Sequence, residues 1–339
     1  MGLITPQSPD SLSRFSLADD TNSNCHFCDI SHCFHIPFSV NIGIMIVDQP
    51  SPVVDQTLHL PRILCLHGGG TNARIFRAQC RIIKRYLSTT FRLVFAEAPF
   101  SSDAGPDVTS VYQEFGPFKR WLRSKKSHPK IHPDNAVKAI DDSLKAAMDE
   151  DDRLGGRGEW VGLLGFSQGA KMCASLLFRQ QVRAERLGLH CTGSNWRFAI
   201  ILAGRGPLVS LDHHLLMTPA VVAASEASTT ALPDECLRGS TEHVLYLPTI
   251  HVHGTQDAGL NEHRKLLSQY CEEGTARLME WEGNHRVPIK TKDAIALVQN
   301  IWDIAYETGI LTKQLDVEAI VQAEAFQPAN VFRPRTILA

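Results

Sequence analysis

The chain has 339 residues, of which 43% are hydrophobic and 21% are charged, and its formal net charge is -2 at pH 7. These values give no electrostatic reason to expect a nucleic acid or an anionic membrane surface as a partner. No apolar run approaches the roughly 20 residues that span a bilayer, and the N-terminus lacks the basic and apolar blocks of a signal peptide. Together with nine cysteines, an odd number, this favours free thiols and a cytoplasmic location.

Residues 1–58 are polar and rich in Ser and Asp, so we predict a poorly ordered extension ahead of the folded domain. The segment contains Cys25-His26-Phe27-Cys28 and, close by, Cys33-Phe34-His35. Thiolate and imidazole groups at this spacing suit tetrahedral zinc, but there is one C-x2-C pair and no second pair at finger-like spacing. A simple extension is therefore the preferred interpretation, and a zinc site is the alternative.

From Pro61 onward, short apolar runs alternate with segments of helical period. The predicted elements of this half are strands at 63–66 and 91–96, and helices through 76–87 and from residue 133. A long loop rich in Gly, Pro and aromatic residues runs from Pro99 to about His132. The acidic, glycine-rich stretch 149–159 is also predicted as a loop.

The second half continues the alternation. The predicted elements are strands at 160–164, 198–202, 249–253 and 275–281, and helices around 170–178, 266–270 and 294–305. Residues 205–247 lack strong periodicity and are predicted as a lid or insertion, and 309–339 as a C-terminal tail with one more helix around 317–326. Continuous apolar strands joined by helices predict an α/β domain over 59–308, with a mostly parallel central sheet and helices on both faces.

One motif joins the strand at 160–164 to the helix at 170–178, namely Gly165-Phe166-Ser167-Gln168-Gly169. The G-x-S-x-G pattern in a strand, turn and helix resembles the nucleophile elbow of α/β-hydrolases, whose sharp turn lifts a serine hydroxyl above the sheet. Glycine at 165 and 169 lets the helix lie close to the strand that precedes it. The alternative is a turn serine that is flanked by glycines and has no catalytic role.

A serine hydroxyl is a weak nucleophile at neutral pH, so Ser167 needs a base, and that base needs an acid to fix its tautomer. Asp257 follows the predicted strand that Gly254 closes, and His285 lies in the loop after the last predicted strand. The order Ser, Asp, His is that of α/β-hydrolases. We therefore predict Ser167, Asp257 and His285 as catalytic residues. The alternatives are a solvated loop acid at Asp257 and, among 15 histidines, a different base.

Acyl transfer also needs hydrogen-bond donors for the oxyanion. The backbone N–H of Gln168, just after the nucleophile, is one candidate. The second donor is predicted at Gly69 or Gly70, in the glycine loop after the first strand. A phosphate-binding loop is disfavoured there because no G-K-S/T follows.

Aromatic residues of the long loop after Pro99 are candidates for the walls of an apolar acyl pocket. The predicted substrate-binding residues are Phe115, Phe118, Trp121 and, from the insertion, Leu208. The alternative is that these side chains belong to the core.

Six motifs together resemble the fungal serine hydrolase family over about residues 61–308. They are Leu66-His67-Gly68 with Asn72, Glu97-Ala98-Pro99, Gly116-Pro117-Phe118 with Trp121, Gly165 to Ala170, His253 to Asp257, and Gly283-Asn284-His285. The family includes esterases and stand-alone thioesterases that release polyketides from their synthases, such as the lovastatin type. The resemblance implies an α/β-hydrolase fold with a triad at Ser167, Asp257 and His285. This chain departs from the pattern at Glu97, where the family usually has Asp, and in residues 1–58.

The resemblance implies a serine hydrolase that cleaves an acyl thioester or ester through an acyl-enzyme in fungal secondary metabolism. Its partner would be a small-molecule acyl ester or a carrier-protein-bound thioester of a polyketide synthase, and no metal or organic cofactor is expected. Two alternatives remain. One is a carboxylesterase acting on a small metabolite, and the other is a non-catalytic binding module with the hydrolase fold.

Overall fold

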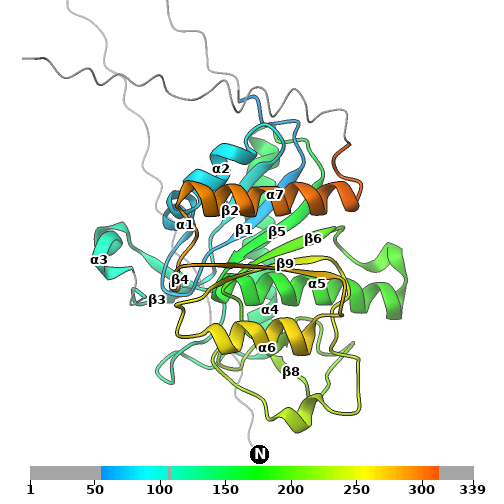
Figure 1. Ribbon diagram of the computed structural model, residues 1–339. Helices are drawn as coiled ribbons and strands as arrows, with labels where there is room; N and C mark the ends of the chain where they lie inside the picture. The colour runs from blue at the N-terminus through cyan, green and yellow to red at the C-terminus, as the bar shows by residue number, and fades with distance from the viewer. Residues whose placement is uncertain (1–54, 106–107, 313–339) are drawn as a thin grey trace, which may run out of the picture. The chain divides into compact units, whose positions relative to one another are not determined.

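A six-stranded parallel sheet forms the centre of the computed structural model, which describes residues 55–105 and 108–312 (Figure 1). The strand order is β10-β9-β6-β5-β1-β2, and every neighbouring pair is parallel. The strands are β1 (Arg62–Leu66), β2 (Arg92–Ala96), β5 (Trp160–Phe166), β6 (Phe198–Leu202), β9 (Thr249–Gly254) and β10 (Ala276–Trp281). The predicted mostly parallel sheet is confirmed.

Helices cover both faces of this sheet, as predicted. They are α1 (Ala73–Gln79), α2 (Arg81–Leu87), α4 (Pro133–Arg153), α5 (Gln168–Leu187), α6 (Leu260–Tyr270) and α7 (Thr291–Glu307). In Figure 1, α2 and α7 lie above the sheet and α5 and α6 lie below it. The side chains of β1 alternate accordingly, since Leu64 and Leu66 belong to the cluster with α4 and α5, and Ile63 and Cys65 to the cluster with α1, α2 and α7.

Two segments differ from their predicted structure. The single helix expected through 76–87 is two helices that meet at Cys80. The loop expected at 149–159 was wrong in its first five residues, because α4 continues to Arg153. The reason is a long-range contact: the carboxylate of Asp151 is buried and pairs with Arg62 and Arg92 at the starts of β1 and β2. Local composition does not reveal such a partner.

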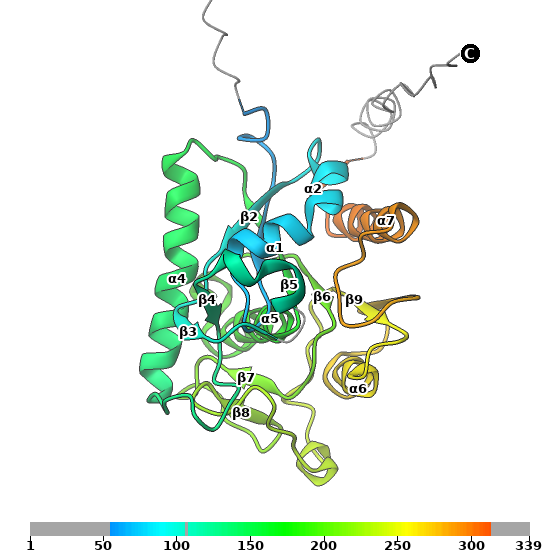
Figure 2. The same ribbon diagram turned by 90° about the vertical axis from the view of Figure 1, so that its left-hand side faces the viewer.

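The segments expected to be irregular contain short elements. Between β2 and α4 lie β3 (Phe100–Ser102), α3 (Thr109–Tyr112), the 3-10 turn η1 (Gln113–Phe115) and β4 (Phe118–Arg120). β3 and β4 form an antiparallel pair. The 205–247 insertion contains β7 (Leu208–Ser210), β8 (Val221–Ala223) and the 3-10 turn η3 (Asp234–Leu237), while η2 (Leu189–Cys191) follows α5. β7 and β8 are parallel to each other, and β7 lies beside α5 (Figure 2).

The sheet topology brings the loops of interest to one edge. In a parallel sheet all strands end on the same side, so the loops after β1, β5, β9 and β10 converge there. None of the helices in the described residues is long and apolar enough to cross a membrane. Residues 1–54 of the predicted N-terminal extension, with its zinc alternative at Cys25 and Cys28, and the predicted helix around 317–326 lie outside the described residues.

Candidate active site

Ser167 occupies the turn between β5 and α5 in a backbone conformation that side chains rarely adopt, with φ 54° and ψ -112°. Such strain persists only where the surroundings fix it. Here they do, because a Cβ atom at Gly165 would lie 2.4 Å from the carbonyl oxygen of Gly169, and one at Gly169 would lie 2.1 Å from that of Leu66. The two glycines therefore let α5 approach β5 and β1 and hold Ser167 at the turn.

The structure brings the three predicted catalytic side chains into one hydrogen-bonded chain. The hydroxyl oxygen of Ser167 lies 3.0 Å from Nε2 of His285, and Nδ1 of His285 lies 2.7 Å from Oδ2 of Asp257. These distances suit a base that accepts the serine proton and an acid that fixes the tautomer of the base. The three residues come from the loops after β5, β9 and β10.

Asp257 is held as a carboxylate by its surroundings. Its Oδ1 atom accepts a hydrogen bond of 2.8 Å from the backbone N–H of Gly259. Burial by itself would raise the pKa of Asp257, but this N–H and two histidines outweigh burial, and the pKa lies below its ordinary value. The negative charge is therefore retained beside His285 at neutral pH.

The second of those histidines is His263, on α6, which the sequence reasoning missed. Its Nε2 lies 3.0 Å from the same Oδ2 atom of Asp257, and its Nδ1 lies 2.9 Å from the carbonyl oxygen of Gly204. Burial lowers the pKa of His263, although Asp257 opposes this effect. Its position, six residues after Asp257 and just before the predicted helix around 266–270, did not indicate these contacts. His263 fixes the carboxylate that orients His285.

Two backbone N–H groups beside Ser167 are free to bind an oxyanion. Among the described residues, none accepts a hydrogen bond from the N–H of Gly69 or of Gln168. The N–H of Gly70 differs, because it donates to the carbonyl oxygen of Lys119 at 2.9 Å. Of the two glycines considered from the sequence, the structure therefore favours Gly69.

The side chain of Gln168 connects the start of α5 to residues 121–122 and to Ser228 through hydrogen bonds. Its Oε1 atom accepts hydrogen bonds from the N–H groups of Trp121, at 2.7 Å, and Leu122, at 3.1 Å. Its Nε2 atom donates to the carbonyl oxygen of Leu122 and to the hydroxyl of Ser228, both at 3.1 Å. Every polar atom of this buried side chain is used, so the residue that follows the nucleophile has one fixed position.

A cavity of about 370 Å³ opens beside Ser167. It is lined by Gly69, Gly70, Ser102, Asp103, Ala104, Gly105, Ser124, Lys125, Ser167, Gln168, Lys171, Arg205, Ser228 and Thr229. Most of these residues are small or polar, and four carry charge. Neither Lys171 nor Arg205 was a candidate from the sequence, because a single cation in a helix or loop is normally a surface residue.

The four residues predicted to form an apolar acyl pocket do not line this cavity. Trp121 and Leu208 are fully buried, and Nε1 of Trp121 donates to the carbonyl oxygen of His67 at 2.9 Å. The ring of Phe115 packs against Tyr112 and the guanidinium of Arg74, and Phe118 belongs to β4. Trp121 therefore ties its own segment to the loop after β1, because a buried indole N–H needs a hydrogen-bond partner.

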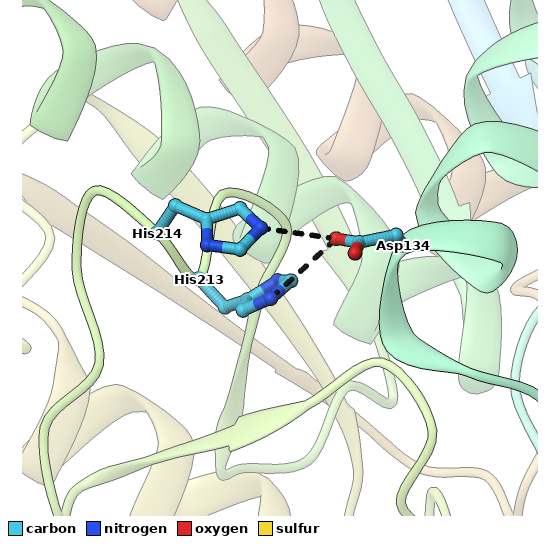
Figure 3. Close-up of side chains that lie close together, drawn as sticks. All are labelled: Asp134, His213 and His214. Carbon is cyan, nitrogen blue, oxygen red and sulfur yellow. Dashed lines mark ion pairs between the residues drawn. The ribbon is translucent and has the colours of Figure 1, made fainter.

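Two clusters in the described residues place three metal-type side chains within 4.8 Å of one another. One is Asp257, His263 and His285, which the hydrogen bonds above already explain. The other is Asp134 with His213 and His214, whose Nε2 atoms each lie 3.4 Å from Oδ1 of Asp134 (Figure 3). Asp134 and His214 are largely exposed, and none of the three lines the cavity beside Ser167. A carboxylate that pairs with imidazoles at the surface accounts for this arrangement.

The sheet, the elbow and the three-residue chain define an α/β-hydrolase with the geometry of a serine hydrolase. Comparison with known proteins agrees. The model of the serine hydrolase (FSH1) family matches residues 57–296, and the chain belongs to this family.

Curated relatives are similar over most of their length. The chain is 70% identical over 265 residues to esterase pigG of Monascus ruber, an alignment that covers 77% of this chain and 97% of the relative. It is 56% identical over 260 residues to the probable esterase tazC of Aspergillus terreus, covering 76% and 97%. Among solved structures, Zea mays acyl-protein thioesterase 2 matches with a TM-score of 0.41 and 14% identity, covering 74% of this chain and 96% of that one.

Proposed function

We propose that this protein is an esterase that cleaves an acyl ester through a covalent intermediate on Ser167. The observation that carries the proposal is the hydrogen-bonded chain from Ser167 through His285 to Asp257, set on a strained turn at the end of β5. The family and the relatives named as esterases support the same reaction class.

The steps follow from the positions of these groups. Nε2 of neutral His285 takes the hydroxyl proton as Oγ of Ser167 attacks the ester carbonyl, and Asp257 stabilises the imidazolium. The oxyanion is stabilised by the N–H groups of Gly69 and Gln168. His285 then returns the proton to the leaving alcohol. A water molecule, deprotonated by His285, hydrolyses the acyl-enzyme in the second half of the reaction.

We further propose that the substrate belongs to fungal secondary metabolism, either as a small-molecule ester or as a polyketide thioester on a carrier protein. The same triad attacks both kinds of carbonyl, so it does not separate them. The names of the relatives favour an oxygen ester. Hydrolysis of oxygen esters and thioesters of equal acyl length distinguishes the two, since a thioesterase would prefer the thioester of each pair.

The test is labelling with a fluorophosphonate probe, read by intact mass, together with hydrolysis of a nitrophenyl ester. We expect one adduct on the wild type and none on Ser167→Ala, with turnover reduced by up to about a millionfold. Ser268→Ala, which changes an exposed serine of α6, is the matched control and should label normally. A folded wild-type protein without an adduct would refute the proposal and favour a non-catalytic binding module.

A further inference from the structure

Lys171 lies four residues after Ser167 on α5, and its amine is buried in the wall of the active-site cavity. Lys171 is 1% exposed and lines the cavity, and its Nζ atom makes a single hydrogen bond, of 3.0 Å, to the carbonyl oxygen of Ser228. No carboxylate among the described residues forms an ion pair with it. Buried lysines are normally paired, because an unpaired buried charge is costly.

Arg205, three residues after the end of β6, is a second cation without an acidic partner in the same wall. It is half-buried, and it makes no hydrogen bond or ion pair with the residues that the structure describes. The two other charged groups of the cavity neutralise each other, since Nζ of Lys125 lies 2.8 Å from Oδ2 of Asp103. Lys171 and Arg205 therefore remain as two basic side chains beside the nucleophile with no acidic partner among the described residues.

Burial, and secondarily Arg205, lowers the pKa of Lys171 to about 7. Burying an amine costs free energy unless its N–H groups are hydrogen-bonded, and the single bond to the carbonyl oxygen of Ser228 leaves the other N–H groups of Lys171 without a partner among the described residues. An anion bound between the two cations would restore the charge of Lys171 and satisfy its remaining N–H groups. The volume of about 370 Å³ is at the small end of the range for ligand sites.

We propose that Lys171 and Arg205 form a subsite for a negatively charged oxygen group carried by the substrate. The inference rests on the proposed esterase function and deepens it, because it states the charge of the substrate. Two sources supply this chemistry: a carboxylate on the acyl chain, or a phosphate on the leaving group of a carrier-type thioester. Both present oxyanions that Lys and Arg bind through charge-assisted hydrogen bonds.

The experiment compares matched charged and neutral substrates. For the acyl side these are the mono-4-nitrophenyl ester of glutarate and 4-nitrophenyl valerate, and for the leaving group S-acetyl phosphopantetheine and S-acetyl pantetheine. We expect the wild type to prefer the charged member of one pair by about 10- to 100-fold in kcat/KM, the range of hydrogen bonds to charged groups. The pair that shows the preference identifies the source.

Lys171→Met and Arg205→Gln should each bring that preference close to one, and Arg205→Lys should keep most of it. Lys292→Met, an exposed lysine on α7, is the matched control and should keep the full preference. Should Lys171→Met not fold, the two Arg205 variants carry the test. Binding to the subsite is also measured without turnover, as the decrease in the rate at which the fluorophosphonate labels Ser167 when free glutarate or phosphopantetheine is present.

Three results are decisive. Loss of the preference and of the protection in the variants supports the subsite. Labelling of the wild type with equal kcat/KM for charged and neutral substrates, and no protection, overturns the subsite and leaves the esterase function standing. Absence of labelling in the folded wild type overturns the esterase function itself. In that case the subsite is tested by calorimetric titration with glutarate and phosphopantetheine, and the absence of binding refutes the subsite as well.

Discussion

His251 and His253 occupy alternate positions of β9, and both side chains are fully buried. Neither ring nitrogen of His253 has a hydrogen-bond partner among the described residues. Burial, and then the neighbouring histidines, lowers the pKa of His251 to about 3 and that of His253 to about 4. The folded protein thus keeps two neutral imidazoles at a pH where the unfolded chain protonates them.

The sign of the resulting pH dependence is fixed. Between pH 6.5 and about 4 the unfolded chain binds more protons than the folded protein at His253, so stability falls as the pH falls through this window. We predict that His253→Leu removes about 2 kcal/mol of the loss between pH 8 and pH 5. Thermal midpoints at the two pH values measure this, with the exposed-site variant His190→Gln as the control. An equal loss in wild type and His253→Leu would contradict the prediction.

At the level of residues, the sequence identified those catalytic candidates that follow strands. These three residues, Ser167, Asp257 and His285, could be predicted because the ends of parallel strands lie at one edge of the sheet, however the helices pack on it. The roles of Lys171 and His263 could not be predicted, because they depend on the groups that surround these side chains in the folded protein. The aromatic residues of the loop after Pro99 were misplaced for the same reason: side chains suited to a pocket wall are equally suited to the core.

The end of α4 is tied to the sheet by charge. Asp151 is 4% exposed; its Oδ1 accepts from Nε of Arg92 at 2.8 Å, and its Oδ2 lies 3.3 Å from Nη1 of Arg62. We predict that Asp151→Ala lowers the free energy of unfolding by about 3–5 kcal/mol, because it removes one carboxylate partner from the buried Arg62 and from the largely buried Arg92. Urea unfolding followed by circular dichroism measures the change.

The same helix offers a control for that prediction. Asp142 pairs with Lys138 at 2.6 Å, but both side chains are more than half exposed. Asp142→Ala should therefore change the free energy of unfolding by no more than about 0.5 kcal/mol. Equal effects of the two substitutions would show that burial of the pair at Asp151 contributes nothing.

Elements with a regular apolar period were predictable and those fixed by distant partners were not. β6 was placed at its observed bounds, because five apolar residues in a row are typical of a buried strand. The three-residue strands β7 and β8 gave no such signal, since each is too short for a period and is defined by pairing with the other. The break between α1 and α2 at Cys80 likewise interrupts a continuous apolar stripe.

At the scale of the whole molecule, the cores lie well inside the described residues. The two hydrophobic clusters draw all their members from residues 63–311, and the family match begins at residue 57. The contact that lies nearest to the start of the described chain is an ion pair, with Nη1 of Arg92 2.6 Å from Oδ2 of Asp55. This hydrogen bond, and secondarily those from Thr57, lowers the pKa of Asp55 to about 2.

These boundaries predict that a chain of residues 55–312 folds and keeps an active serine. We expect fluorophosphonate labelling of Ser167 within about twofold of the full-length rate and a thermal midpoint within about 2 °C. A chain that starts at residue 61 is the informative comparison, because it loses Asp55 and the hydroxyl of Thr57, both of which bond Arg92. Its midpoint should be lower than that of the 55–312 chain. Loss of labelling in a folded 55–312 chain would mean that the terminal segments contribute to the active site, and the domain boundaries drawn from the family match would then be too narrow.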